Sequence, residues 1–263
     1  MRIVTLMENT SCREDLTAEH GLSLYIETGE YRILFDAGQT GAFADNAEKL
    51  GIDLSKVDLA VLSHGHYDHG GGLRRFLEIN KTAPVWMNPH AFGEHYNGSE
   101  KYIGLDPALA KSGRIRYAEN ERTIGPGMTL FTRIPCPEPI RPFGLRIREG
   151  EGLVPEDFRH EQYLLVEEDG RKLCFSGCSH RGILNIMEHF RPDVLIGGFH
   201  FMKLDPAGAE LEAAAARLRR YPCIYYTGHC TGREQYETLK DRLGSRLHSL
   251  SSGKEIRLMG ENS

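Results

Sequence analysis

The sequence predicts an α/β fold in which helices pack against the outer faces of β-sheets. Apolar, strand-like segments alternate with helix-like segments along the chain, and such alternation is typical of layered α/β domains. Four of the strand-like segments end in polar clusters, which read SHGHYDH, SGCSH, GGFH and TGHC. In folds of this class, the loops at strand ends direct side chains into one crevice. We therefore expect the functional site to lie where these four segments end.

Four strands and one helix are expected in the first part of the chain. The strands cover residues 2–8, 21–29, 31–38 and 57–64. Gly29 and Glu30 separate the second strand from the third, which favours a hairpin turn. The helix covers residues 41–50, and Gly51 ends it because glycine readily adopts the conformation that follows a helix.

The second half of the chain repeats this arrangement. Strands are expected over residues 162–168, 172–180 and 192–200, with 223–230 as the final strand, and helices over 181–190 and 207–220. Arg191 and Pro192 end the first of these helices, since proline cannot continue it. Residues 97–160 are the least periodic part, and we expect loops and short strands near the site there.

Length and composition restrict the class of protein. The chain has 263 residues, 40% of them hydrophobic, and a formal net charge of −5; we expect one domain over residues 1–263. An acidic protein lacks the basic surface that nucleic acids or anionic membranes require, so the expected partner is a small-molecule substrate, and the oligomeric state is left open, a homo-oligomer included. Without a recognisable signal peptide or membrane span, we expect a cytoplasmic protein with reduced cysteines.

The segment HGHYDH at residues 64–69 carries the clearest chemistry. His64, His66, Asp68 and His69 place four potential metal ligands within six residues, on a tight loop in which His69 begins the following helix. Imidazole and carboxylate together suit zinc, iron or manganese. The alternative is a solvated histidine-rich loop, but the apolar strand before the segment and the glycines 70–72 after it favour a metal site, because glycines let the backbone turn close to the metals.

With this motif the chain resembles the metallo-β-lactamase superfamily, and the resemblance extends over essentially the whole chain. It implies a four-layer αββα sandwich with two metal ions at one edge of the sheets. One metal would be held by His64, His66 and a further histidine, and the other by Asp68, His69 and a late histidine. The resemblance implies two divalent ions, with zinc favoured over iron or manganese.

Later strand ends must supply the remaining ligands. His229 in TGHCTG matches the late histidine of the family. Cys178 stands where relatives carry an aspartate or a cysteine that joins the metals, and both a ligand role and an inert buried thiol remain open. His160 and His180 are alternatives for the third histidine. We favour His180 because it lies on the same side of the chain as Cys178 if the strand continues, and because His160 lacks the usual surroundings.

Several phrases point to one branch of this superfamily. The chain resembles the family named for 7,8-dihydropterin-6-methyl-4-(β-D-ribofuranosyl)-aminobenzene-5′-phosphate synthase. The resemblance is carried by the phrases EHGLSLYIE, LFDAG, LSHGHYDHGGG, SGCSHRGILN, GGFH and TGHCTG.

His200 in GGFH is distinctive, and we expect it to donate a proton or contact a substrate phosphate rather than to act structurally. Glu19 and His20 are either a supporting pair or a plain loop. Candidates for a substrate anion, each alternatively a surface arginine, are Arg133, Arg141, Arg146, Arg148 and Arg159.

The expected function is that of a dinuclear metal enzyme acting on a small phosphorylated or heterocyclic substrate. It would be either a hydrolase using a metal-bound water or a dihydropterin-synthase-like transferase using a metal-held leaving group. Asp68 would hold one metal and orient the water. The alternatives are a non-catalytic ligand-binding or sensing protein and a diiron redox protein. The complete metal motif weighs against the first, and the absence of a flavodoxin-like domain weighs against the second.

Overall fold

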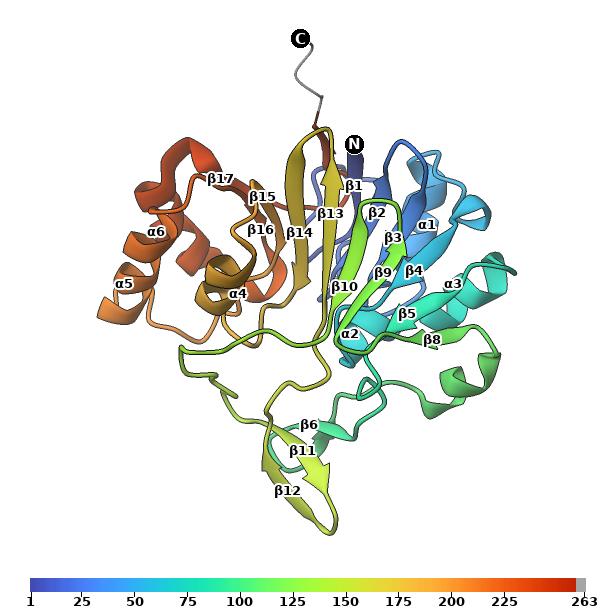
Figure 1. The fold of residues 1–263 in the computed structure, drawn as a ribbon, viewed down its shortest axis with the longest axis horizontal. Helices are drawn as coiled ribbons and strands as arrows, with labels where there is room; N and C mark the ends of the chain where they lie inside the picture. The colour runs from blue at the N-terminus through green and yellow to red at the C-terminus, as the bar shows by residue number, and fades with distance from the viewer. Residues whose placement is uncertain (259–263) are drawn as a thin grey trace.

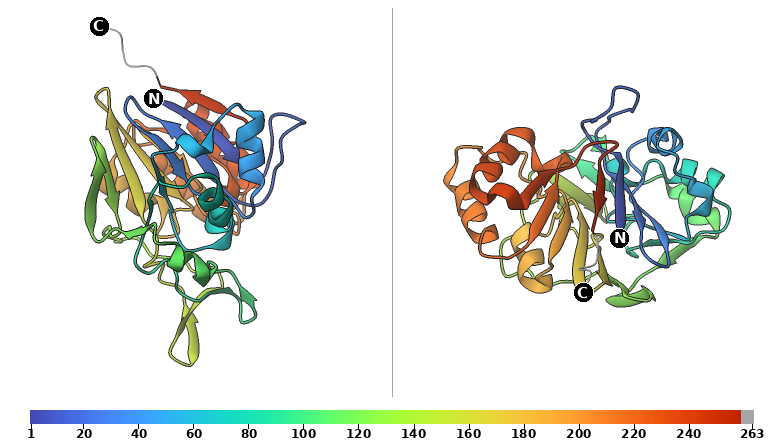
Figure 2. Two further views of the ribbon diagram at one scale, coloured as in Figure 1. Left: turned by 90° about the vertical axis from the view of Figure 1, so that its right-hand side faces the viewer. Right: turned by 90° about the horizontal axis from the view of Figure 1, so that it is seen from above.

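The computed structural model, which describes residues 1–258, has two seven-stranded sheets packed face to face between two layers of helices (Figure 1). The view from above shows the order helix, sheet, sheet, helix across the molecule (Figure 2). The predicted αββα sandwich is therefore confirmed. An apolar cluster that includes Ile26, Phe35 and Phe175 fills the space between the sheets, and separate clusters fill the space between each sheet and its helices.

The first sheet has the strand order β18-β1-β2-β3-β4-β5-β8. Its strands are β1 Arg2–Met7, β2 Ser23–Glu27, β3 Arg32–Phe35, β4 Leu59–Val61, β5 Val85–Met87, β8 Ile115–Tyr117 and β18 Glu255–Arg257. Helices α1 Ala42–Lys49 and α3 Leu73–Ile79 cover its outer face (Figure 1). Alternate side chains of β1 serve the two faces: Ile3 packs between the sheets, whereas Val4 packs with the helices, as the period of two in a strand requires.

The second sheet has the order β17-β16-β15-β14-β13-β10-β9. Its strands are β9 Glu121–Gly125, β10 Met128–Phe131, β13 Tyr163–Glu168, β14 Arg171–Gly177, β15 Val194–Gly197, β16 Ile224–Thr227 and β17 Leu247–Ser249. Helices α4 Ile183–Phe190, α5 Ala209–Leu218 and α6 Arg233–Leu243 cover its outer face. On β14, Phe175 packs between the sheets and Cys174 packs under the helices.

A smaller four-stranded sheet, β12-β11-β6-β7, projects from the sandwich on the same side as helix α2 (Tyr67–Gly70), which contains part of the HGHYDH segment (Figure 1). Its strands are β6 His95–Asn97, β7 Lys101–Tyr102, β11 Leu145–Glu149 and β12 Gly152–Pro155. The weakly periodic residues 97–160 thus form loops and short strands, as predicted. Short 3₁₀ turns cover Leu54–Lys56, Pro107–Ser112, His229–Thr231 and Gly244–Arg246.

The predicted strands and helices all exist, but several strands end earlier than predicted: those over residues 57–64, 192–200 and 223–230 end at Val61, Gly197 and Thr227. The strand predicted over residues 172–180 ends at Gly177, because the backbone leaves the sheet at Ser179 with a φ of 58°. Residues 223–230 are not the final strand, since α6, β17 and β18 follow. The hairpin between β2 and β3 is confirmed by antiparallel pairing. Within residues 1–258, no helix is long and apolar enough to cross a membrane.

Candidate metal centre

The HGHYDH segment follows β4 and enters α2, Tyr67–Gly70, at the edge of the two sheets (Figure 1). The helix begins earlier than predicted, with His66 as its N-cap, so that Asp68 and His69 both lie within its single turn. His64 and His69 are fully buried, and as whole residues His66 and Asp68 are no more than 9% exposed. The segment is therefore an enclosed site and not a solvated loop.

The glycines after the motif allow close packing of the backbone. A Cβ on Gly71 would lie 2.1 Å from the carbonyl oxygen of Gln39, and one on Gly72 would lie 2.1 Å from that of Ala37. These contacts are with the loop that follows β3, so the glycines let α2 press against that loop. That glycines 70–72 also let the backbone turn close to metal ions stays a prediction.

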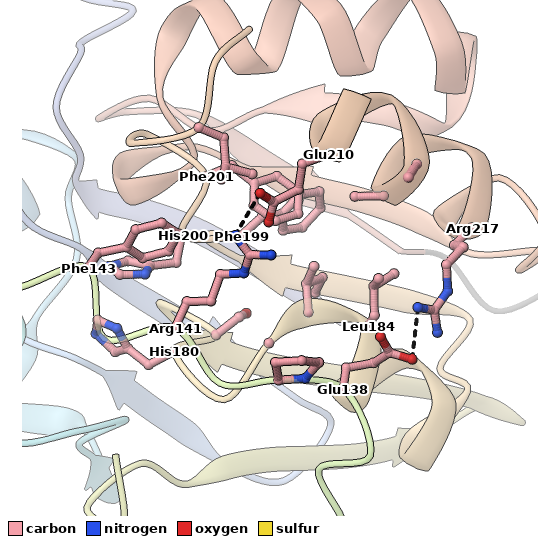
Figure 3. A pocket seen from close by; sticks show the side chains of 17 residues that line it. Glu138, Arg141, Phe143, His180, Leu184, Phe199, His200, Phe201, Glu210 and Arg217 are labelled. Atoms are coloured by element: carbon pink, nitrogen blue, oxygen red, sulfur yellow. Dashed lines mark hydrogen bonds and ion pairs between the residues drawn. The ribbon is translucent and has the colours of Figure 1, made fainter. Parts of the chain in front are cut away.

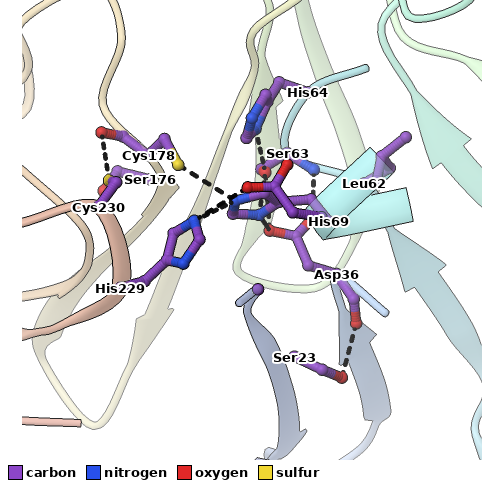
Figure 4. A network of polar contacts seen from close by, with 12 residues as sticks. Ser23, Asp36, Leu62, Ser63, His64, His69, Ser176, Cys178, His229 and Cys230 are labelled. Carbon is purple, nitrogen blue, oxygen red and sulfur yellow. Dashed lines mark hydrogen bonds and ion pairs between the residues drawn. The ribbon is translucent and has the colours of Figure 1, made fainter. Parts of the chain in front are cut away.

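Hydrogen bonds fix which ring nitrogen of His64 and His69 carries the proton (Figure 4). Nδ1 of His69 lies 2.6 Å from Oδ2 of Asp36. The hydroxyl of Ser63 donates to the same carboxylate at 2.7 Å and accepts from Nδ1 of His64 at 2.8 Å. Because a carboxylate only accepts, both rings carry a proton on Nδ1, and in their neutral forms they present an unprotonated Nε2.

His229 is held in the same state from the opposite side of the site. Its Nδ1 lies 2.9 Å from Oδ1 of Asn9, and its backbone N–H donates to the buried carboxylate of Glu8. Nδ1 therefore carries the proton, and the free Nε2 faces Nε2 of His69 at 3.2 Å. The sulfur of Cys178 lies 3.1 Å from the same His69 nitrogen.

This arrangement fits a bound cation. Two unprotonated imidazole nitrogens cannot hydrogen-bond to each other, and their lone pairs repel at 3.2 Å in a buried site. A divalent ion between them removes the repulsion, and imidazole, thiolate and carboxylate are ligands that such ions take in proteins. Three donor groups, each a set of buried residues whose potential metal-ligand atoms lie within 4.8 Å of one another, surround this point. They are His64, Cys178 and His180; His69, Cys178 and His229; and His64, Asp68 and His69.

His180, and not His160, lies beside His64. The two Nε2 atoms of His180 and His64 are 3.3 Å apart. Glu161, fully buried, accepts the backbone N–H groups of His180 and Arg181 at 2.7 and 3.0 Å and so holds the turn. His160 instead accepts the backbone N–H of Gly65 through Nδ1. Although β14 ends before His180, the turn at Ser179 still brings His180 and Cys178 into one group with His64.

Asp68 lies between two histidines. Its Oδ2 is 3.3 Å from Nε2 of His229 and 3.3 Å from Nε2 of His20. Burial alone would raise the pKa of Asp68, but the hydrogen bond from His20 and the surrounding histidines outweigh burial and hold the pKa well below its usual value. Glu19, which precedes His20 in the chain, accepts the backbone N–H groups of Gln39 and Thr40. Both residues thus support the site: His20 contacts Asp68, and Glu19 holds the loop that contains Gln39 and Thr40.

Four residues of the site adopt left-handed backbone conformations. Asp36, Ser179, His200 and His229 have φ values of 58°, 58°, 55° and 48°. Such conformations are uncommon outside glycine and cost free energy. Each of the four lies one to three residues after the end of a strand, where the backbone turns sharply. The strain is therefore concentrated where strand ends meet the site.

Burial controls the protonation of the remaining groups. It lowers the pKa of His64, His66 and His180 well below the ordinary value, because the low-dielectric interior disfavours a charged ring. For His69, the contact with Asp36 outweighs burial and raises the pKa. Burial likewise raises the pKa of the Cys178 thiol, and a cation beside the sulfur is what would favour the thiolate.

His200 borders the metal pocket without joining the donor groups. It lies with His66, Asp68, His180 and His229 along one cavity of about 190 Å³, and its ring centroid is 4.2 Å from that of His180. Burial lowers its pKa to about 4. His200 is therefore a neutral ring near pH 7, which offers a substrate one N–H donor and one lone pair.

The predicted arginine cluster does not form at the metals. Arg133 and Arg159 line a separate cavity, and Arg148 pairs with Glu94 on the projecting sheet. Arg146 is exposed and donates to the carbonyl oxygen of Leu153 on that same sheet. Arg141 lines the cavity next to His200 but pairs with Glu210. The cations that line the metal pocket are Lys101 and Lys203, which the sequence analysis missed because single lysines in loops carry no pattern.

Sequence reasoning also missed the residues that orient the ligands. They are Glu8, Asn9, Asp36, Ser63 and Glu161. Asp36 stands in the phrase LFDAG, which was noted only for its resemblance to a branch. A carboxylate at a strand end, ahead of a metal motif, is a usable sign of such an orienting residue.

Comparison with known proteins agrees with this geometry. The profile of the Metallo-beta-lactamase superfamily matches residues 16–190. The chain is 27% identical over 287 aligned residues to the 7,8-dihydropterin-6-methyl-4-(β-D-ribofuranosyl)-aminobenzene-5′-phosphate synthase of Methanocaldococcus jannaschii, covering 98% of this chain and 96% of the relative. It is 29% identical over 214 residues to an uncharacterised protein of the same organism, covering 76% and 79% of the two chains.

One solved structure is similar over almost its full length. Tm1679, described as a metal-dependent hydrolase of the β-lactamase superfamily, superposes with a TM-score of 0.84 at 28% identity, covering 98% of this chain and 99% of that one. The matched profile includes the HGHYDH segment, Cys178 and His180, and the solved structure shares the αββα fold. The chain therefore belongs to the metallo-β-lactamase superfamily.

Proposed function

We propose that the protein is a dinuclear metal-dependent enzyme that acts on a small heterocyclic or phosphorylated molecule. One observation carries the proposal: the unprotonated Nε2 atoms of His69 and His229 face each other at 3.2 Å, with the Cys178 sulfur 3.1 Å from His69. A fold that holds no cation has no need of this repulsive arrangement. The proposed enzyme is one domain with a small-molecule substrate, cytoplasmic, and independent of nucleic acid and membranes.

The donor groups suggest how two ions would be held. His64, His66 and His180 would hold one ion, and Asp68, His69 and His229 the other, with Cys178 beside both. Zinc suits this mixture of imidazole, carboxylate and thiolate. Two such ions lower the pKa of water and polarise a substrate oxygen. Asp68 is kept ionised by the hydrogen bond from His20 and can accept a hydrogen bond from a water molecule in the pocket.

A second cavity supports a substrate with a flat, apolar ring. The cavity, of about 230 Å³, adjoins the metal pocket, since His180, His200 and Phe143 line both. Phe199, Phe201 and Leu184 form much of its wall, and Arg141–Glu210 and Glu138–Arg217 ion pairs border it (Figure 3). An aromatic ring would stack between these side chains, with a polar group directed at His200 and Lys203.

Hydrolysis is the first candidate reaction, because Tm1679, the solved structure of similar fold, is described as a hydrolase. A transferase of the dihydropterin-synthase type is the second candidate. It is favoured by the 27% identity with the synthase along 98% of the chain and by the apolar cavity beside His200. In either reaction His200, neutral near pH 7, would hydrogen-bond a substrate oxygen or nitrogen.

The metal part of the proposal is tested by elemental analysis of untagged protein. We expect about two metal ions per chain for the wild type, and fewer for His229→Ala and His66→Ala. His189→Ala, on helix α4, is the matched control and should retain both ions. Less than one ion per chain in the wild type, or unchanged content in both site variants, contradicts the proposal.

A turnover screen then separates the candidate functions. Phosphodiesters and lactones test hydrolysis, and a dihydropterin pyrophosphate with an aromatic amine acceptor tests transfer. Hydrolysis should be lost in His229→Ala and preserved in His189→Ala. No turnover of any of these substrates, together with tight retention of a ligand by the metal-loaded protein, favours the non-catalytic binding alternative.

A further inference from the structure

A second buried cluster of polar side chains lies next to the metal centre. It consists of His66, His95, Glu156 and His160, whose ligand atoms lie within 4.8 Å of one another. None of the four is more than 4% exposed. The Nε2 atoms of the three histidines have no hydrogen-bond partner. Buried polar atoms rarely remain unpaired, so this cluster requires an explanation.

The surrounding hydrogen bonds fix the protonation of two rings. Nδ1 of His95 lies 2.7 Å from Oε2 of Glu156 and must carry the proton, since a carboxylate only accepts; its Nε2 is therefore a lone pair. Nδ1 of His160 accepts the backbone N–H of Gly65 at 2.8 Å. A neutral His160 therefore carries its proton on Nε2.

These assignments argue against a third metal ion in the cluster. Both oxygens of Glu156 are engaged, one by His95 and the other by the backbone N–H of Phe158 at 3.2 Å. His160 presents a proton instead of a lone pair. Apart from His66, only Nε2 of His95 is free to bind anything, and a single nitrogen does not make a cation site. The cluster thus encloses one acceptor, Nε2 of His95. The Nε2 proton of His160 is not directed at it, because the rings of His95 and His160 lie over each other at an angle of 31°, with centroids 3.9 Å apart, and no hydrogen bond joins them. The acceptor therefore needs another donor.

His66 is placed to supply that donor. Its ring meets the ring of His95 edge to face, with centroids 5.4 Å apart at an angle of 80°. His66 lines the metal pocket, whereas its Nε2 is enclosed and unpaired. If Nε2 of a neutral His66 carries the proton, Nδ1 carries the lone pair. Because the two ring nitrogens point in different directions, one can face His95 while the other faces the pocket.

We propose that His95, held by Glu156, is a positioning residue for His66. The Nε2 lone pair of His95 accepts the Nε2 proton of His66, directly or through one water molecule. This fixes the ring and tautomer of His66, so that Nδ1 is the atom that binds metal. The inference deepens the proposed function, on which it rests, by naming two residues that select the ligand atom. Carboxylate–histidine pairs of this kind orient metal ligands in other proteins.

The test compares two substitutions at one position. His95→Phe keeps a ring but removes the lone pair, whereas His95→Gln restores an acceptor oxygen. Metal affinities are measured by competition with a chromophoric chelator, and the cobalt-substituted proteins are compared by visible absorption. We expect His95→Phe to weaken one of the two ions by roughly 10- to 100-fold and to change the cobalt spectrum. His95→Gln should recover most of the affinity and the wild-type spectrum.

A direct readout of the tautomer complements these affinities. In zinc-loaded protein with ¹⁵N-labelled histidine, His66 should show a protonated Nε2 and a metal-bound Nδ1. Where His95→Phe does not fold, Glu156→Gln serves as the second variant, and we expect a loss of about 10-fold in the same affinity.

The outcomes separate this inference from the proposed function. Wild-type protein that binds no metal overturns both. Wild-type protein that binds two ions, with unchanged affinities in His95→Phe, overturns the role of His95 alone. Equal weakening in His95→Phe and His95→Gln, matched by equal loss of thermal stability without metal, also overturns it, because it indicates a packing role.

Discussion

Nε2 of His69 and Nε2 of His229 lie 3.2 Å apart, although these residues are separated by 160 positions along the chain and belong to different halves of the sandwich. Asp36 holds the proton of the first ring on Nδ1, and Asn9 does the same for the second. With both rings neutral, neither nitrogen can donate to the other. The fold thus brings together two lone pairs whose close approach a positive charge, a metal ion or a proton, relieves.

Removal of metal should therefore destabilise the protein. A ligand present at 1,000 times its dissociation constant stabilises the native state by about 4 kcal/mol, which corresponds to roughly 10 °C in Tm for a chain of this length. Dialysis against a chelator is expected to lower Tm by this amount, and added zinc should restore it. Calorimetry checks the shift. Identical melting curves before and after chelation would show that no cation relieves the repulsion.

Asp36→Asn should weaken metal binding while leaving the fold intact. Asp36 accepts from His69, from the Ser63 hydroxyl and from the Ser63 backbone, and an amide cannot accept all three. We expect roughly 10- to 100-fold weaker binding of one ion, measured by chelator competition. Asp58→Asn is the matched control, because the carboxylate of Asp58 accepts the backbone N–H of Arg32 at the opposite end of the β3–β4 pair. Equal affinities in the two variants contradict the assigned role.

Gly71→Ala should destabilise the protein even without metal. The added Cβ would lie 2.1 Å from the carbonyl oxygen of Gln39 and 2.6 Å from that of Tyr67, and both are backbone atoms that cannot move alone. Overpacking of this kind costs about 1–3 kcal/mol in the free energy of unfolding. Urea denaturation of chelated protein measures the loss. Gly152→Ala, whose Cβ meets nothing closer than 4.0 Å, should leave the free energy nearly unchanged.

The cysteines should differ sharply in reactivity at alkaline pH. Burial raises the pKa of Cys223 to about 12, so only about one molecule in 10,000 carries its thiolate at pH 8. Cys12 is exposed. Iodoacetamide at pH 8 should therefore modify Cys12 within minutes and native Cys223 far more slowly. Because higher pH favours the thiolate, the Cys223 rate should rise tenfold per pH unit up to its pKa. Peptide mass spectrometry identifies the modified residues, and rapid labelling of native Cys223 would contradict its burial.

Much of the fold could be predicted locally. The period of two in β1 and β14, the Gly29–Glu30 turn and the glycine after α1 are short-range features, and the elements form where they predict. Helix α6 was missed because its sequence, REQYETLKDRL, is strongly polar. Its side chains Leu239 and Leu243 join the apolar cluster between the helices and the second sheet, and this packing is visible only in the tertiary structure.

The sequence by itself identified the candidate metal motif, because His64, His66, Asp68 and His69 lie within six consecutive positions and need no distant partner to be recognised. The tertiary structure alone placed His180 beside His64, revealed the hydrogen bonds of Asp36, Asn9, Glu161 and His95, and removed the arginines from the site. The physical reason is that a ring's usable nitrogen is set by the hydrogen bond at its other nitrogen. Those partners come from strand ends tens to hundreds of positions away, which only the packed sheets bring together.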